Sequence, residues 1–76
     1  MTPADIRAFA ERVHPRFERN NWRWYKRVPT VEQIERTCAD LVCILERYPD
    51  TPFVASARVL ARRTPGGGIE LFCEGD

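Results

Sequence analysis

The sequence predicts an α+β domain in which two amphipathic helices pack on a C-terminal β-hairpin. Two observations carry this prediction: apolar residues recur at helical spacing in the first two-thirds of the chain, and a triple glycine near the C-terminus precedes an alternating segment. The chain has 76 residues, which fits a single small domain spanning residues 1–76. A core of this size stabilises the folded state by only ~3–5 kcal/mol, so we expect the chain to associate into a homo-oligomer.

The first helix is predicted to begin at the N-terminus of the chain. Thr2 can cap it, Pro3 fits the first helical position, and Asp5 places a carboxylate near the positive end of the helix dipole. One apolar stripe follows at steps of three and four: Ile6, Phe9, Ala10, Val13 and Phe17. Proline disfavours helical geometry in the residue before it, so we expect the helix to end or kink at His14-Pro15.

The second predicted helix starts from a capping box. In the segment T-V-E-Q, the Thr30 hydroxyl can accept a forward amide bond while the Gln33 side chain reaches back. A second apolar stripe follows at helical spacing: Val31, Ile34, Cys38, Leu41, Val42, Leu45 and Tyr48. Cys43 lies off this stripe, and Pro49 is expected to end the helix.

The segment from Phe53 to Arg63 admits two interpretations. It fits a strand that pairs with Ile69–Glu74 across T-P-G-G-G, because glycines permit the positive φ values of a hairpin turn and residues 69–74 alternate as a strand does. It also fits a third helix over residues 52–63, capped by Thr51, which would make the protein all-α. A lone strand would lack a partner, so the hairpin is favoured.

The stretch N-N-W-R-W-Y-K-R, Asn20–Arg27, interleaves aromatic rings with cations. Such a mixture can stack on bases and neutralise phosphates, but a small domain also needs its largest apolar side chains inside. In an extended conformation Trp22 and Trp24 point to one face, and Arg23 and Tyr25 to the other. We therefore expect the tryptophans in the core, on an additional aromatic strand, with a partner-facing cluster as the alternative.

Charge is distributed unevenly along the chain. Residues 1–27 carry seven cations and three anions, a balance of +4, whereas residues 28–50 carry two cations and five anions, a balance of −3. This division suits self-association, and arginine and aromatic side chains are enriched at the hot spots of protein interfaces. The residues predicted to contact a protein partner are Arg16, Arg19, Arg23, Tyr25, Lys26 and Arg27.

The stretch R-R-T-P-G-G-G, residues 62–68, gives an alternative site. Glycine-rich loops can offer backbone amides to phosphate, and adjacent arginines add positive charge. The stretch lacks G-x-x-x-x-G-K-[ST], so a plain hairpin turn is favoured. Under the alternative, an oligomer would hold an anionic nucleotide or a short nucleic acid through Arg58, Arg62, Arg63, Gly66 and Gly67.

Catalytic and metal chemistry find little support in the sequence. His14 and the three cysteines match no familiar zinc spacing. The carboxylate pairs Glu32/Glu35 and Glu70/Glu74 show no sign of burial, and a chain this short has little room for a closed pocket. We therefore expect a non-enzymatic binding protein without catalytic residues, metal or cofactor. The net charge of +1 is not that of a general nucleic-acid binder.

The number of cysteines and the hydropathy of the chain indicate the cellular compartment of the protein. The odd number of cysteines (Cys38, Cys43 and Cys73) and a start without an apolar leader predict a reduced, cytoplasmic protein. No apolar run approaches the ~20 residues of a membrane span, so we expect no membrane contact.

Three segments together suggest a relationship. A W-x-W segment is followed by P-T and a helix carrying I-x-x-x-x-x-x-L (Pro29 to Leu41), and then by a glycine-bearing hairpin that ends in I-E-L. This layout, over about two-thirds of the chain, resembles small uncharacterised accessory proteins of tailed bacteriophages. The resemblance implies an accessory or anti-defence factor that binds a host protein stoichiometrically or sequesters a nucleotide signal. It implies no residue roles, because no motif of a particular inhibitor family is present.

Overall fold

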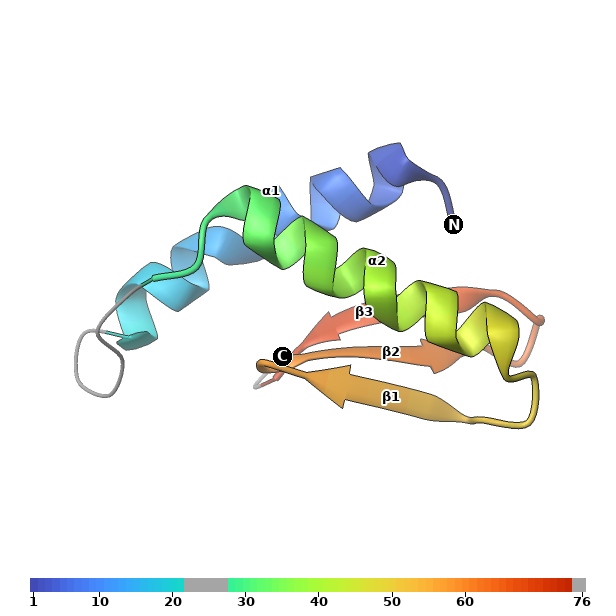
Figure 1. Ribbon diagram of the computed structural model, residues 1–76. Helices are drawn as coiled ribbons and strands as arrows, with labels where there is room; N and C mark the ends of the chain where they lie inside the picture. Colours follow the sequence, from blue (N-terminus) through green and yellow to red (C-terminus); the bar gives the residue numbers. More distant parts are fainter. Residues whose placement is uncertain (22–27, 75–76) are drawn as a thin grey trace.

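The computed structural model describes residues 1–21 and 28–74 of the chain. Two helices pack against a C-terminal three-stranded antiparallel sheet, which confirms the predicted α+β class (Figure 1). The sheet has the order β1-β2-β3. The elements are α1 (Pro3–Asn21), α2 (Val31–Arg47), β1 (Phe53–Ser56), β2 (Val59–Arg63) and β3 (Ile69–Cys73). The additional strand expected near Trp22–Tyr25 lies outside the described residues.

Helix α1 begins as its sequence predicts. The Asp5 amide donates to Thr2 Oγ1 over 3.2 Å, and the Thr2 amide donates to Asp5 Oδ2 over 3.0 Å. The bond from the Thr2 backbone amide lowers the pKa of the Asp5 carboxyl. Of the end or kink expected at His14-Pro15, the end is wrong, because α1 continues through Pro15 to Asn21. Proline removes only one helical hydrogen bond, and the continued helix buries Phe17, which is 5% exposed.

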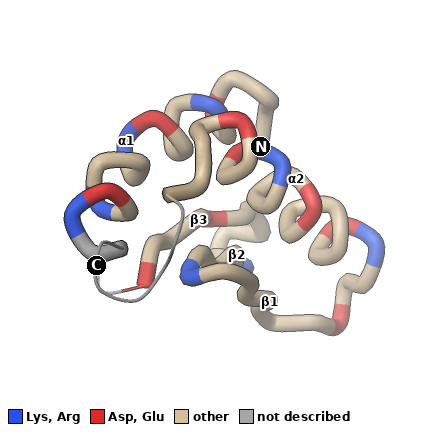
Figure 2. The backbone as a smooth tube through the Cα atoms, turned by 60° about the vertical axis from the view of Figure 1, so that its left-hand side comes forward, with Lys and Arg blue, Asp and Glu red and all other residues tan. Residues whose placement is uncertain are grey.

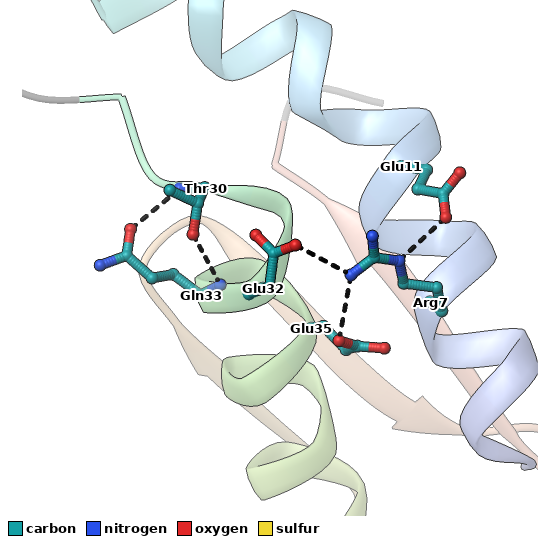
Figure 3. Close-up of polar contacts among 6 residues, drawn as sticks. All are labelled: Arg7, Glu11, Thr30, Glu32, Gln33 and Glu35. Atoms are coloured by element: carbon teal, nitrogen blue, oxygen red, sulfur yellow. Dashed lines mark hydrogen bonds and ion pairs between the residues drawn. The ribbon is translucent and has the colours of Figure 1, made fainter.

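Helix α2 carries the predicted capping box. The Gln33 amide donates to Thr30 Oγ1 over 3.1 Å, and the Thr30 amide donates to Gln33 Oε1 over 2.9 Å (Figure 3). Most of the predicted stripe is buried: Ile34, Cys38, Leu41, Val42 and Leu45. Val31 is half-buried, and Tyr48 is 56% exposed. Tyr48 is the C-cap, and its backbone leaves helical geometry (φ −119°, ψ 85°), so its side chain leaves the stripe.

The segment 53–63 is neither one strand nor a third helix. It forms two strands, β1 and β2, joined by the two-residue turn Ala57-Arg58 between Ser56 and Val59. Both turn residues have positive φ, 51° and 74°, as tight hairpin turns with matched twist require. Neither is glycine or asparagine, so the sequence carries no marker of this turn.

The second hairpin turn is the one predicted at T-P-G-G-G. The Thr64 amide donates to the Gly68 carbonyl and the Gly67 amide to the Thr64 carbonyl, both over 3.0 Å. The Thr64 hydroxyl also accepts the Gly68 amide over 2.9 Å. Gly67 has a φ of 88°, a conformation open to glycine at little cost.

Both helices lie on the same side of the sheet (Figures 1 and 2). Their apolar stripes meet the inward-facing residues of the strands in one core, to which the sheet contributes Val59, Ala61, Leu71 and Cys73, with Val54 and Ile69 packed at its margin. The opposite face of the sheet is left without a covering layer from the described residues.

Arg7 connects the two helices on the surface (Figure 3). Its Nε lies 2.9 Å from Glu11 Oε1, and its Nη1 lies 3.3 Å from Glu32 Oε1 and 3.4 Å from Glu35 Oε1. The bond to Glu11 is the main reason that the pKa of the Arg7 guanidinium is raised. Because the cluster is exposed to solvent, it orients α1 against α2 more than it stabilises the fold.

Among the described helices, none combines the length and the apolar character needed to cross a bilayer.

Replacing Leu45 by alanine should strongly destabilise the fold. Leu45 is fully buried where α2 meets the sheet, so Leu45→Ala removes core contacts and leaves a cavity. We expect a loss of ~2–5 kcal/mol in the free energy of unfolding, measured by urea denaturation. The exposed neighbour provides the control: Glu46→Ala should change it by less than ~0.5 kcal/mol. Equal effects of the two substitutions would contradict the packing described for α2.

Candidate functional site

The outer face of the sheet is the main candidate site. Because side chains alternate along a strand, the residues that do not face the helices form two rows across the three strands. One row is Ala55, Leu60 and Phe72, and the other is Phe53, Arg62 and Glu70. We call these six residues the outer sheet face. Leu60 and Phe72 are half-buried, whereas Phe53 is 56% exposed.

A shallow hollow occupies one end of the outer sheet face. It has a volume of ≈ 570 Å³ and lies over the end of the sheet that carries the Ala57-Arg58 turn. Its floor is mainly apolar, with Leu60 and Phe72 from neighbouring strands, and Arg58, Arg62 and Glu74 lie around it. The hollow therefore combines an apolar centre with charged groups at its margin.

Arg62 is held above the apolar centre. Its guanidinium carbon lies 4.3 Å from the centroid of the Phe72 ring, which is diagonal to it across β2 and β3. Its Nη2 also lies 3.4 Å from Glu70 Oε2, on the residue directly opposite. The ring and the carboxylate together hold the guanidinium over the outer sheet face, where it can donate to a group placed on this face.

Arg58 reaches the same region from the turn. Its left-handed backbone places its carbonyl to accept the Glu74 amide over 2.7 Å. Its guanidinium carbon lies 5.8 Å from the centroid of Phe17 on α1. Arg58 and Arg62 both line the hollow, but the guanidinium of Arg58 lies against Phe17 on the helix side of the sheet, whereas that of Arg62 lies over Phe72 on the outer face.

Arg63 lies on the other side of the sheet and caps the end of α2. Its Nε donates to the Thr51 carbonyl over 2.9 Å, and its Nη2 donates to the carbonyls of Tyr48, over 2.9 Å, and Leu45. The final carbonyls of a helix lack partners within the helix, and a cation there also complements the helix dipole. Within the described structure Arg63 holds α2 to the strands and does not join the hollow.

Gly66 and Gly67 are also separate from the hollow. They belong to the turn after β2, whereas Ala57-Arg58 precedes β2, so the two turns lie at opposite ends of that strand. The glycine-turn amides of Gly67 and Gly68 bond to Thr64, through its carbonyl and its hydroxyl respectively. The structure therefore does not assemble the five predicted anion-binding residues into one site.

Only part of the predicted partner-binding set lies within the described residues. Arg16 and Arg19 are on the last turns of α1; Arg19 is exposed, whereas Arg16 is half-buried and already makes a contact within the chain. Arg23, Tyr25, Lys26 and Arg27 lie outside the described residues. Acidic and basic positions are interspersed along α1 and α2 (Figure 2), so the described helices present mixed charge.

Three of the four acids considered as catalytic pairs take part in ion pairs with arginines. No group of three or more histidine, cysteine or acidic side chains there is arranged to hold a metal ion. Glu32 and Glu35 bind Arg7, and Glu70 binds Arg62 (Figure 3 shows the Arg7 pairs). The pKa of the Glu32 carboxyl is lowered, first by its own backbone amide and then by Arg7.

The three cysteines are free thiols. Cys43 is exposed, as its position off the α2 stripe predicts, whereas Cys38 and Cys73 are buried. Burial raises the pKa of the Cys38 thiol to about 11, and the nearby Cys73 acts in the same direction. A buried thiol with a raised pKa is a poor nucleophile, because the thiolate is the reactive form.

The sequence did not single out Leu60 or Phe72 as functional residues. The alternation of residues 69–74 placed Phe72 on one face of a strand, but it did not show which face the helices cover. The second strand was also missed as a separate element, so the row formed by Ala55, Leu60 and Phe72 could not be constructed.

Comparison with protein-family models, with curated proteins and with solved structures gives no match for this chain.

Replacing Arg63 should destabilise the protein much more than replacing its neighbour. Arg63→Ala leaves the carbonyls at the end of α2 without their charged donor, and we expect a loss of about 2 kcal/mol in the free energy of unfolding. Arg62→Ala removes an exposed ion pair and should cost less than ~1 kcal/mol. Chemical denaturation of both variants makes the comparison. If Arg62→Ala were the more damaging change, the capping role of Arg63 would be wrong.

Stability should fall at alkaline pH through Cys38. The folded-state pKa of Cys38, about 11, is above the ordinary thiol value of 9.0. The protonated thiol therefore makes its full contribution to the free energy of unfolding below pH 9.0, and this contribution is lost as pH rises towards 11. Urea denaturation at pH 8 and at about pH 10 should show the decline. The decline should be smaller in Cys38→Ala and unchanged in Cys43→Ala. A decline that is the same in Cys38→Ala would show that other groups cause it.

Proposed function

We propose that this protein is a non-enzymatic binding protein that docks one partner protein on its outer sheet face. The observation that carries the proposal is the apolar row of Ala55, Leu60 and Phe72, which neither described helix covers, with Arg62 over its aromatic ring. Aromatic and arginine side chains are the groups most often found at interface hot spots, and a partly buried apolar centre is typical of them.

The charge of the face favours a protein over a polyanion. Arg62 on this face is paired with Glu70, and a second carboxylate, Glu74, lies at the same hollow. A nucleic-acid site needs an excess of cations to neutralise phosphates. A protein surface that presents both apolar and charged groups fits this balanced face better.

The partner class follows from the resemblance stated above. Small phage accessory proteins act inside the host cell, so the proposed partner is a host protein in the cytoplasm. Stoichiometric binding of such a protein would inhibit or redirect it without any chemistry by this chain. The proposal therefore describes an accessory or anti-defence factor that acts by occupying a surface.

The proposal can be tested by weakening the outer sheet face without disturbing the core. Phe72→Thr keeps a residue suited to a strand but removes the ring beneath Arg62. We expect the host protein retained by immobilised wild-type chain to be lost with Phe72→Thr and kept with Glu46→Ala, a control on the far side of the molecule. With the purified partner, calorimetry should give a 1:1 complex that Phe72→Thr weakens by about 30-fold, the effect of losing one hot-spot residue.

Two results would overturn the proposal. Equal affinity of wild type and Phe72→Thr would place the binding site elsewhere on the chain. Co-purification of nucleotide or nucleic acid, with an affinity that falls steeply as salt increases, would instead support the anionic ligand considered from the sequence. Circular dichroism of each variant checks that the fold is retained.

A further inference from the structure

Strand β1 forms one edge of the sheet and presents backbone groups along that edge. In an antiparallel pair, alternate residues turn their N–H and C=O towards the neighbouring strand. The Arg63 amide donates to the Pro52 carbonyl over 3.1 Å, and the β1–β2 turn is closed by Ser56 and Val59. Residues 52, 54 and 56 therefore face β2, and the N–H and C=O of Phe53 and Ala55 point away from the sheet.

Natural edges are protected by charged side chains, proline, bulges, short strands or covering segments. Strand β1 is short and follows Pro52, but the described residues provide neither a charge nor a covering segment along it. Here residues 51–57, T-P-F-V-A-S-A, contain no charged residue. Of the four β1 residues only Val54 is even half-buried, and Phe53 is 56% exposed. In the monomer β1 thus leaves most of its apolar surface in water.

A second hollow lies beside this edge. It has a volume of ≈ 500 Å³ and separates β1 from the flank of α2. Apolar side chains of Leu41, Ile44 and Val54 line it together with Thr37 and Asp40, and Ile44 is 39% exposed. An added strand on β1 would therefore meet both open backbone groups and an apolar helix flank.

We propose that β1 pairs antiparallel with β1 of a second copy, with the two-fold axis at Val54. In this register Phe53 lies opposite Ala55 of the second copy, and the reverse. Each such pair exchanges two backbone hydrogen bonds, so the two pairs give four. On the outer sheet face the phenyl ring of each Phe53 lies beside the methyl group of an alanine, which matches a large side chain with a small one.

The available backbone groups select this register. An axis at Phe53 would set the two rings opposite each other and would need Thr51 for further bonds, but the Thr51 amide already donates to the Tyr48 carbonyl over 3.0 Å. An axis at Ala55 would need Ala57, which lies in the left-handed turn and is not extended. Only the axis at Val54 uses both outward residues of both copies.

A second copy is favoured over an unrelated strand because the β1 edge is complementary to itself. The neutral edge meets an identical neutral edge, so pairing brings no like charges together along the strands. The association is isologous and closes at two copies. It produces a six-stranded sheet with all helices on one side, and the row of Ala55, Leu60 and Phe72 continues into Phe53 of the second copy. This inference does not depend on the proposed function.

The experiment measures association by sedimentation velocity between ~1 μM and ~1 mM, a range suited to a small interface. Ala55→Pro removes an N–H that points away from β2, so it blocks the edge without breaking the β1–β2 ladder. Ala55→Ser keeps the N–H and the small side chain and is the matched control. We expect wild type and Ala55→Ser to form dimers, and Ala55→Pro to remain monomeric with unchanged circular dichroism. A wild type that stays monomeric at every concentration, or dimers of Ala55→Pro at wild-type affinity, would overturn the proposal.

Disulfide trapping tests the register, in chains that carry Cys43→Ser to remove the exposed thiol. The two Val54→Cys residues would face each other across the axis with a Cα separation of ~4.5 Å, which a disulfide can span. Ser56 would face Pro52 of the second copy, so two Ser56→Cys residues would lie roughly 13 Å apart along the strands. Mild oxidation should give a covalent dimer with Val54→Cys and not with Ser56→Cys. Faster trapping of Ser56→Cys would show that the register is wrong.

Discussion

Burial of the apolar stripe of α2 is the interaction on which the rest of the structure depends. The helix packs against α1 and against each of the three strands, and its residues Cys38 and Leu45 are fully buried. Because one stripe serves both neighbours, α1 and the sheet are positioned relative to each other through α2. The same arrangement places both helices on one side of the sheet, so the described chain has no element left to cover the other side. The exposed outer sheet face is thus a direct result of how the core is built.

Two adjacent arginines of β2, Arg62 and Arg63, lie on opposite sides of the sheet and have different roles. Arg63 points towards the helices and binds three carbonyls around the end of α2, which joins this end to the strands. Arg62 points the other way and lies over Phe72 on the outer sheet face. Their roles follow from strand alternation, since successive side chains leave a sheet on opposite sides. A pair of arginines that looks like one basic motif in the sequence is therefore one helix cap and one surface group.

Local sequence patterns were sufficient to predict both helices and the glycine turn. The stripes from Ile6 to Phe17 and from Val31 to Leu45, the capping box at Thr30 and the glycine turn are all local patterns with local causes. The errors occur where tertiary packing overrides local preference. Phe17 holds α1 together beyond Pro15, and the turn at Ala57-Arg58 forms without a turn residue because the strands on either side can pair. To predict the outer sheet face, one must know the strand register and which side of the sheet the helices cover. Neither can be inferred from any short segment of the sequence.

Local opening of the sheet is expected to be uneven because of the turn at Ala57 and Arg58. A non-glycine residue in the left-handed region costs ~1–2 kcal/mol, and this turn contains two of them. Strand β1 ends at that turn and buries little, whereas β2 and β3 are joined by a glycine turn and bury Val59, Ala61 and Leu71. Amide hydrogens of β1 should therefore exchange through a low-energy opening that leaves the β2–β3 hairpin and α2 intact. We therefore expect the β2–β3 hairpin to persist when β1 opens, because β1 contributes least of the three strands to the buried core.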